Sequence, residues 1–219
     1  MRIIKYFFLA ILSVPFIGCE KAETFNNTDT HVGISRVTNF PILTVTGAEY
    51  IPISMGGAYV EPGVTAVEGG ATIPVTTTGT VNTSTPGVYH LVYSAVNKDG
   101  YSASASRNVV VYSTAPDAAA NDFSGNYART TNGSVATWTK IAPGVYSVFN
   151  PGGAPGTSLT VIVFNSAGLT IDIPAQITND GNTTSSTDEV YDSGATPPRY
   201  SWKIVNPGYG TALRTFVKQ

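Results

Sequence analysis

The chain has 219 residues and a formal net charge of −2, and 12% of its residues are charged, about half the usual fraction. No basic patch is present, which argues against nucleic acid as a partner. Its single cysteine excludes an intramolecular disulfide, so stability must come from apolar cores. Val, Ile, Tyr and Thr recur in short runs without long helical periodicity, and this predicts an all-β protein.

The amino-terminal stretch has the pattern of a secretory signal peptide. Two basic residues, Arg2 and Lys5, precede an apolar run that ends just before Gly18 and Cys19. We therefore predict a signal peptide over residues 1–18. The run is shorter than the roughly 20 apolar residues that a membrane-spanning helix needs. An ordinary signal peptide followed by an incidental cysteine is the alternative interpretation.

The segment Phe16-Ile17-Gly18-Cys19 resembles the lipobox of bacterial lipoproteins. The resemblance implies lipidation of the Cys19 thiol and cleavage just before it. Several acyl chains at about 0.8 kcal/mol per buried methylene then anchor the protein without a membrane span. Acidic residues behind the cysteine, Glu20 and Glu23, resemble the surface-export signal of Bacteroidota lipoproteins. This implies the outer face of the outer membrane rather than the periplasm, with residues 19–37 as a tether.

Residues 38–112 show short strand-like runs separated by turn residues, which is typical of a β-sandwich. The turn Asp99-Gly100 between two of the runs is a strong hairpin signal. The expected strands cover residues 39–45, 50–53, 59–66, 73–76, 87–96 and 102–112.

Three segments of this region, Gly57–Ala66, Thr85–Tyr93 and Ala105–Val111, resemble a bacterial immunoglobulin-like domain. The resemblance implies a sandwich of the seven-stranded type. It places Tyr89 where a tyrosine corner would lie, and Leu91 where antibody domains have a disulfide cysteine. The neighbouring side chain of His90 is expected to point to the opposite face.

Residues 113–122 are rich in small residues with Pro and Asp, so we predict a linker there and a second β domain over residues 123–219. Alternation is clear at Leu169, Ile171 and Ile173, where one face should be buried. We expect an antiparallel meander closed as a small sandwich or barrel. The expected strands lie at 123–129, 135–140, 144–149, 159–164, 169–173, 200–205 and 211–217.

The second domain resembles the carboxy-terminal domain of small Bacteroidota lipoproteins encoded beside starch-utilisation-type nutrient importers. The matching segments are Phe123–Arg129, Gly144-Val-Tyr146, Asn150-Pro-Gly-Gly153 and Tyr209–Phe216. The resemblance implies a role in nutrient capture, with a TonB-dependent transporter and its surface lipoprotein lid as partners. It transfers no catalytic residues.

The sequence offers little chemistry. Neither histidine lies in a zinc-binding or nucleophile motif, so we predict no catalytic residue, no metal site and no cofactor. The densest acidic cluster, Asp188, Glu189 and Asp192, lies in a Thr/Ser-rich segment (182–193) that we expect to be a loop. Carboxylates of this kind can bind calcium, and a solvated acidic loop is the alternative.

Aromatic residues of the second domain are the better candidates for binding a glycan or peptide. Tyr191 and Tyr209 lie in predicted loops, where binding residues are over-represented. Arg199, beside Pro197-Pro198, could add a polar contact. Trp138 and Trp202 are also candidates, with burial in the domain core as the alternative.

These observations lead to one hypothesis and two alternatives. We expect a non-enzymatic, lipid-anchored surface protein that assists a TonB-dependent importer of glycans or peptides in the outer membrane. The main alternative is a structural or adhesive surface lipoprotein without a nutrient role. A small hydrolase is a further alternative, because a pair of carboxylates can in principle serve glycoside hydrolysis.

Overall fold

The computed structural model describes residues 31–32 and 35–219. The signal peptide expected over residues 1–18 and the lipidation site Cys19 lie outside the described residues. Within the part of the chain that is described, no helix has the length and apolar character to cross a membrane. Residues 39–219 form one compact unit, which holds both β domains.

Two very short strands precede this unit. They are β1 (His31–Val32) and β2 (Ser35–Arg36), which pair antiparallel. Both fall in the segment predicted to be a tether.

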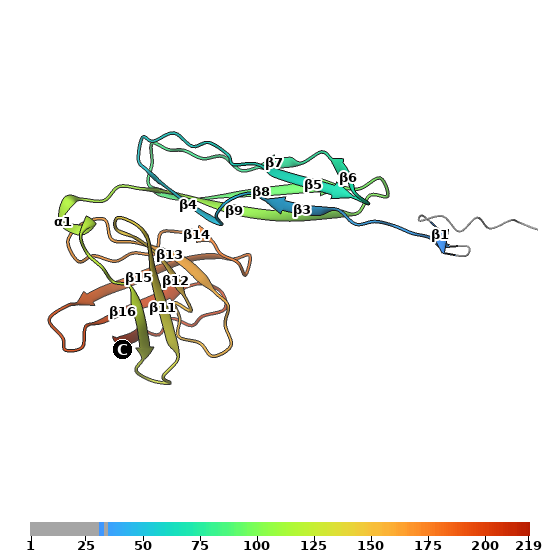
Figure 1. Cartoon of the computed structure of the whole chain (residues 1–219). Helices are drawn as coiled ribbons and strands as arrows, with labels where there is room; N and C mark the ends of the chain where they lie inside the picture. Colours follow the sequence, from blue (N-terminus) through green and yellow to red (C-terminus); the bar gives the residue numbers. More distant parts are fainter. Residues whose placement is uncertain (1–30, 33–34) are drawn as a thin grey trace, which may run out of the picture. The chain divides into compact units, whose positions relative to one another are not determined.

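The immunoglobulin-like region consists of two sheets (Figure 1). The first has the order β3-β5-β6 and the second the order β4-β9-β8-β7. All pairs are antiparallel except β4 with β9. The strands are β3 (Ile42–Val45), β4 (Tyr50–Ser54), β5 (Val64–Glu68), β6 (Ala71–Ile73), β7 (Thr76–Thr78), β8 (Gly87–Val96) and β9 (Ser102–Tyr112).

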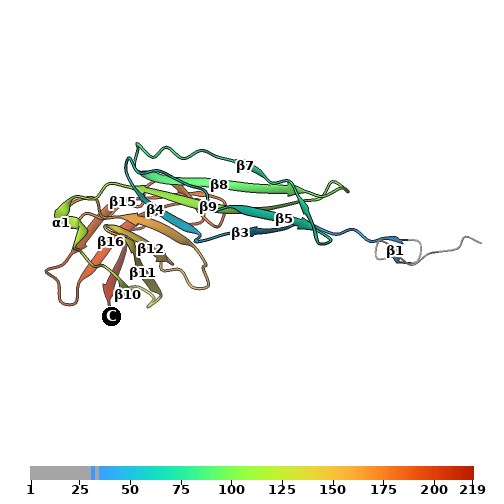
Figure 2. The same ribbon diagram turned by 45° about the horizontal axis from the view of Figure 1, so that its top comes forward.

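The long hairpin of β8 and β9 confirms the prediction from the Asp99-Gly100 turn (Figure 2). Gly100 has a φ of 88°, a left-handed conformation that glycine adopts without strain. The strand expected over 59–66 starts only at Val64. Pro62 cannot donate to a sheet ladder, and Gly63 has a φ of 112°.

The tyrosine corner is also confirmed. The hydroxyl of Tyr89 donates a hydrogen bond of 2.8 Å to the backbone oxygen of Thr85. Leu91 is buried at the position that the resemblance assigns to a cysteine, and it packs with Tyr93 and Val109. His90 points away from this core and contacts Asn108 at 2.8 Å.

An ion pair between a buried arginine and a partly exposed glutamate links distant segments of this domain. The Arg107 side chain is fully buried, and its Nη1 lies 3.0 Å from Oε1 of Glu61. The hydroxyls of Tyr59 and Tyr93 both donate to Oε2 of Glu61. Burial alone would raise the pKa of Glu61, but these hydrogen bonds lower it below its ordinary value. The carboxylate therefore remains ionised opposite the buried guanidinium.

The segment predicted to be a linker contains a one-turn helix, α1 (Pro116–Ala119). Pro116 occupies the first helical position, where its missing N–H costs nothing. Ala118 is completely buried, so the segment is packed rather than extended.

The carboxy-terminal region is a single antiparallel sheet of eight strands with the order β13-β12-β11-β10-β17-β16-β15-β14. This confirms the predicted all-β domain. The strands are β10 (Gly125–Arg129), β11 (Val135–Ala142), β12 (Val145–Phe149), β13 (Thr160–Phe164), β14 (Gln176–Ile177), β15 (Thr183–Asp192), β16 (Arg199–Val205) and β17 (Arg214–Lys218).

The two edge strands, β13 and β14, meet through side chains, so that the sheet nearly closes on itself. Gln176 accepts a bond from the N–H of Ile162 and donates one to its carbonyl, both at 2.8 Å. Asn179 similarly accepts from the N–H of Thr160 and donates to the carbonyl of Ser158. These amide side chains form hydrogen bonds to the backbone where β13 and β14 do not pair directly, and they thereby protect both sheet edges.

Two sequence predictions in this region are wrong. Residues 182–193 are not a loop, because β15 covers most of them. Thr184 and Ser186 alternate inward, and β-branched threonine suits a strand. Residues 169–173 are not a strand, since only Asp172 forms an isolated bridge, with Phe164. Ile171 and Ile173 are nevertheless buried, as the alternation predicted, whereas Leu169 is 43% exposed, contrary to that prediction.

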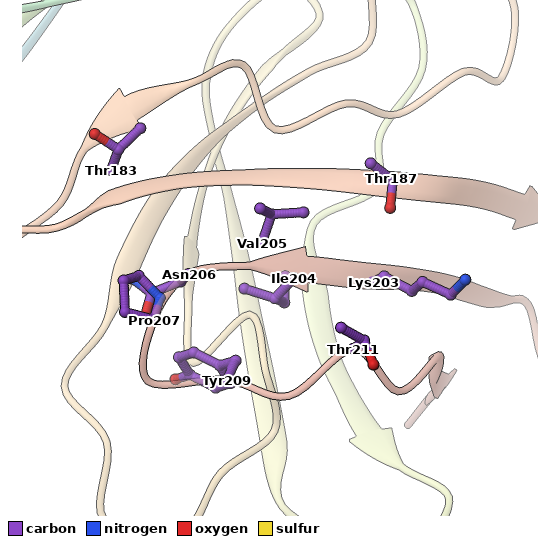
Figure 3. A pocket seen from close by; sticks show the side chains of 9 residues that line it. All are labelled: Thr183, Thr187, Lys203, Ile204, Val205, Asn206, Pro207, Tyr209 and Thr211. Atoms are coloured by element: carbon purple, nitrogen blue, oxygen red, sulfur yellow. The ribbon is translucent and has the colours of Figure 1, made fainter.

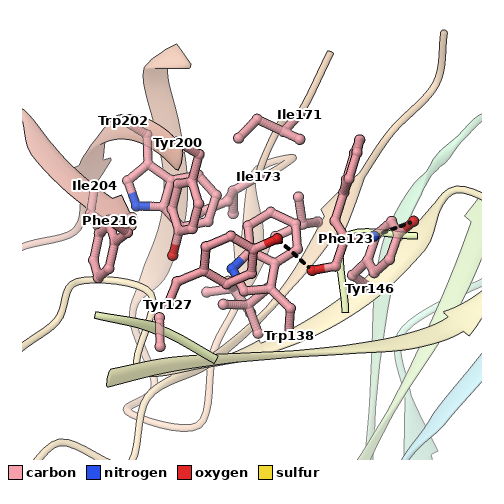
Figure 4. Packing of buried hydrophobic residues seen from close by; sticks show 14 residues of the cluster. Phe123, Tyr127, Trp138, Tyr146, Ile171, Ile173, Tyr200, Trp202, Ile204 and Phe216 are labelled. Carbon is pink, nitrogen blue, oxygen red and sulfur yellow. Dashed lines mark hydrogen bonds between the residues drawn. The ribbon is translucent and has the colours of Figure 1, made fainter. Parts of the chain in front are cut away.

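Aromatic rings fill the inside of the eight-stranded sheet (Figure 4). Trp138 and Trp202 stack with centroids 5.5 Å apart, and Tyr200 stacks on Phe216 at 4.8 Å. The hydroxyl of Tyr127 donates to the carbonyl of Phe123 at 2.9 Å. Rings of this size bury large apolar areas, which suits a domain without disulfides.

A further apolar cluster involves strands of both β domains. Val110 of β9 packs with Val145 of β12 and with Ile162 and Phe164 of β13. All four side chains are buried. The cluster extends the hydrophobic core across residues 39–219.

Candidate functional site

The candidate site is a groove on the outward face of β15 and β16, bordered by the loop that follows β16 (Figure 3). Its volume is about 360 Å³, within the range of small-ligand sites. The lining residues are Thr183, Thr187, Lys203, Ile204, Val205, Asn206, Pro207, Tyr209 and Thr211.

Strand alternation builds the floor of the groove. Trp202 and Ile204 point inward into the core, so Lys203 and Val205 point outward. Thr187 of β15 lies directly opposite Lys203. The Val205 side chain is 49% exposed, which leaves an apolar floor beside threonine hydroxyls.

Tyr209 forms a wall of the groove and is held from several sides. Its ring lies against Gly152, and its hydroxyl is 3.2 Å from Oγ1 of Thr157. The guanidinium carbon of Arg214 lies 5.2 Å from the ring centroid, a cation–π distance. The aromatic ring is thus preorganised, which lowers the entropic cost of binding a ligand.

A buried polar network holds the end of the groove where β16 passes into the loop. The amide of Asn206 donates to Asp180 Oδ2 at 3.0 Å and to Thr184 Oγ1 at 2.8 Å. Burial acts to raise the pKa of Asp180, but hydrogen bonds from Thr178, Asn206 and Asn182 hold it well below its ordinary value. Asp180 is therefore a permanent acceptor that fixes the start of the loop.

The groove combines apolar and hydroxyl-bearing surface with one ammonium group. Lys203 Nζ lies 2.5 Å from Oδ2 of Asp188, so its charge is balanced at the surface. Such a lining suits a ligand with an apolar ring face and hydroxyl edges. In the described part of the chain, no group of three or more His, Cys, Asp or Glu side chains could hold a metal ion.

Of the candidates from the sequence, the structure places Tyr209 in a loop that lines the groove, but it buries two others. Trp138 is 2% exposed and Trp202 is 0% exposed. Both belong to the aromatic core, where Trp202 Nε1 donates to the carbonyl of Pro151 at 2.8 Å. The assignment of these two residues to a binding surface is therefore corrected, because the nearly closed sheet turns their face inward.

Tyr191 and Arg199 lie outside the groove. Tyr191 stacks on Phe123 with centroids 4.2 Å apart and is on strand β15 rather than in a loop. Arg199 is paired with Asp192 at 3.0 Å beside a separate hollow. The predicted candidates are thus not brought together into one site.

Sequence reasoning missed the groove residues Val205, Pro207 and Thr187. The alternation of β16 predicts that Val205 is outward, once Trp202 is recognised as inward. Thr187 could not be assigned to a strand face from the sequence, because its segment was predicted to be a loop.

A lipoprotein of Bacteroides thetaiotaomicron is similar with 24% identity and a TM-score of 0.41, over 82% of this chain and 100% of that one. The M60 catalytic domain with two CBM51 domains of Clostridium perfringens ZmpB has 15% identity and a TM-score of 0.33, over 84% of this chain and 21% of that one. The chain thus spans about a fifth of the clostridial structure. No curated protein matches the chain.

A family model described as the immunoglobulin-like domain of bacterial surface proteins matches residues 43–111. These residues contain most of the two-sheet sandwich from β3 to β9, and the match confirms the fold that the sequence resemblance implied. This part of the chain thus matches an immunoglobulin-like domain of the kind described for bacterial surface proteins.

Proposed function

We propose that this protein is a non-catalytic lipoprotein of the bacterial cell surface that binds a glycan for a TonB-dependent importer. In this proposal Cys19 carries the lipid, and the anchor holds the protein on the outer membrane, facing the exterior. The immunoglobulin-like domain serves as a spacer between the anchor and the ligand-binding domain. The carboxy-terminal domain presents the groove to the ligand.

The observation that carries this proposal is the fixed ring of Tyr209 beside the apolar floor of Val205. Sugar rings stack on exposed aromatic faces and place their hydroxyls against polar groups. The groove offers threonine hydroxyls at Thr183, Thr187 and Thr211 for such contacts. An aromatic residue in a groove favours ligand capture over docking through a flat apolar patch.

The match to an immunoglobulin-like domain of bacterial surface proteins supports the proposal, as do the lipobox and the resemblance to lipoproteins encoded beside nutrient importers. That resemblance includes two segments around the groove, Asn150–Gly153 and Tyr209–Phe216. A glycan-binding subunit adds affinity to an importer by raising the local concentration of its substrate.

The test uses two matched valine substitutions. Val205→Glu places a charge on the groove floor, whereas Val190→Glu places the same charge on β15, outside the groove, at a side chain that is 57% exposed. Both proteins are screened against a glycan array. We expect Val205→Glu to lose at least tenfold in affinity and Val190→Glu to lose less than twofold.

Copurification addresses the importer role separately. The tagged protein is recovered from detergent-solubilised outer membrane, and its partners are identified by mass spectrometry. Recovery of a TonB-dependent transporter and its lipoprotein lid at near-equal amounts supports the proposal. Recovery of the protein alone, with no glycan bound on the array, would favour a structural or adhesive surface protein.

A further inference from the structure

Two arginines lie at one end of the eight-stranded sheet, on its inner side. Arg129 ends β10, and Arg214 begins the adjacent strand β17. Arg129 pairs with Phe216, so Arg214 lies two residues farther along the neighbouring strand. Arg214 shares its face with the buried Phe216, and Arg129 shares its face with the buried Tyr127. Both side chains therefore lie on the inner face at this end of the sheet, at the rim of the aromatic core.

Loop carbonyls position both guanidiniums but accept hydrogen bonds from only some of their N–H donors. Nη1 of Arg129 donates to the carbonyls of Gly152 at 3.3 Å and Gly153 at 3.2 Å. Nη1 of Arg214 donates to those of Gly210 at 3.3 Å and Ala212 at 3.1 Å. The Nε atom of each arginine is buried without a partner. Among the described residues, Nη2 of neither arginine has a hydrogen-bond acceptor.

The pair has no counter-charge. Neither arginine takes part in an ion pair within residues 31–32 and 35–219. Arg214 is only 7% exposed, and buried charges are ordinarily paired. Burial, together with the charge of Arg129, lowers the pKa of Arg214. The two cations therefore repel each other in a poorly solvated place, and a bound anion would relieve both effects.

The arginine pair is linked to the groove through Gly152 and Tyr209. Arg129 holds the carbonyl of Gly152, the ring of Tyr209 lies against Gly152, and Arg214 lies over that ring. These contacts connect Tyr209, which lines the groove, to both guanidiniums. Guanidinium donors match the geometry of a carboxylate, which they bind in bidentate fashion.

We propose that Arg129 and Arg214 form an anion subsite that binds the carboxylate of an acidic sugar. The assignment of an acidic sugar as the ligand rests on the proposed function. The anion subsite itself depends only on the two arginines that lack a counter-charge. The subsite narrows the ligand class to glycans that contain uronic acids. If the arginines served only to hold loop carbonyls, the repulsion between their charges would remain unexplained.

The test compares two ligands that differ chiefly in charge, because the methyl ester replaces each carboxylate with an uncharged ester group. Trigalacturonate and its methyl ester are titrated calorimetrically into the full chain, purified in detergent. We expect the acid to bind at least tenfold more tightly than the ester. Equal affinity for the two ligands would overturn the proposal.

Variants assign the effect to the arginines. Arg129→Gln and Arg214→Gln should each lower the affinity for the acid at least tenfold and leave that for the ester within twofold. Lys98→Gln removes the same charge from an exposed site in the other β domain and should leave both affinities unchanged. An equal loss of affinity for the acid in Lys98→Gln would show that the effect comes from the net charge of the protein, and it would overturn the subsite.

A second readout separates this proposal from the proposed function. Sulfate is titrated into the unsubstituted protein and into Arg129→Gln, and the arginine Nε–Hε resonances are followed by NMR. Arg129 is chosen for substitution because it is less buried than Arg214. Saturable shifts that disappear in Arg129→Gln would support the anion subsite even where no glycan binds, in which case only glycan capture fails. The absence of shifts with both sulfate and trigalacturonate would overturn the subsite itself.

Discussion

The ring of Tyr209 lies so close to Gly152 that a Cβ atom added to this glycine would be 2.1 Å from Cε1 of the ring. No side chain other than hydrogen fits at position 152 while Tyr209 keeps its place. The contact joins two loops that are far apart in the sequence, and it determines where the aromatic wall of the groove lies.

Gly152→Ala should displace Tyr209 and weaken glycan binding at least tenfold. Overpacking of this kind costs about 1–3 kcal/mol of folding free energy, which urea denaturation measures. Gly210→Ala is the matched control in the Tyr209 loop, because a Cβ there meets nothing within 4 Å. If both variants bind the glycan equally well, Tyr209 is not part of the site.

Gln176→Ala should open the seam between β13 and β14. The substitution leaves the N–H and carbonyl of Ile162 without their partner, and unsatisfied buried backbone groups cost about 1–3 kcal/mol. Hydrogen exchange should show loss of protection in β13. Asn179→Ala removes the more exposed seam bonds and should cost less; an equal or larger cost would contradict the role of Gln176.

Glu61→Gln should destabilise the immunoglobulin-like domain by about 2–3 kcal/mol, because Arg107 then remains buried without a counter-charge. The figure lies below the roughly 3–5 kcal/mol expected for a fully buried pair, since the Glu61 side chain is 33% exposed. Chemical denaturation measures the change. The control is Asp188→Asn, which breaks the surface pair with Lys203 and should cost at most about 1 kcal/mol. Similar losses in the two variants would contradict a special role for Glu61.

The stability of the chain should fall in acid, in part through Glu61. Its pKa is lowered in the folded state, so its contribution is fully present above the unfolded value of about 4.3. That contribution is lost as the pH falls through the lower folded pKa. The difference in urea midpoint between pH 7 and pH 3 should therefore shrink in Glu61→Gln. An unchanged difference would show that other carboxylates cause the acid sensitivity.

Local sequence patterns determined much of the fold. The Asp-Gly turn and the apolar runs on either side of it define the hairpin of β8 and β9, because turn geometry and strand propensity act over a few residues. The tyrosine corner at Tyr89 is also local, since its bond reaches only four residues back. The same is true of the buried positions Ile171 and Ile173, which follow from alternation.

The site required the tertiary structure. Alternation says that Trp202 and Val205 lie on opposite faces of their strand, but only the closure of the sheet decides which face is inside. Closure depends on Gln176 meeting Ile162, and β17 lies between β10 and β16, which brings Arg214 beside Arg129. Contacts between residues so distant in the chain have no local signature, because they arise from the order in which the strands pair.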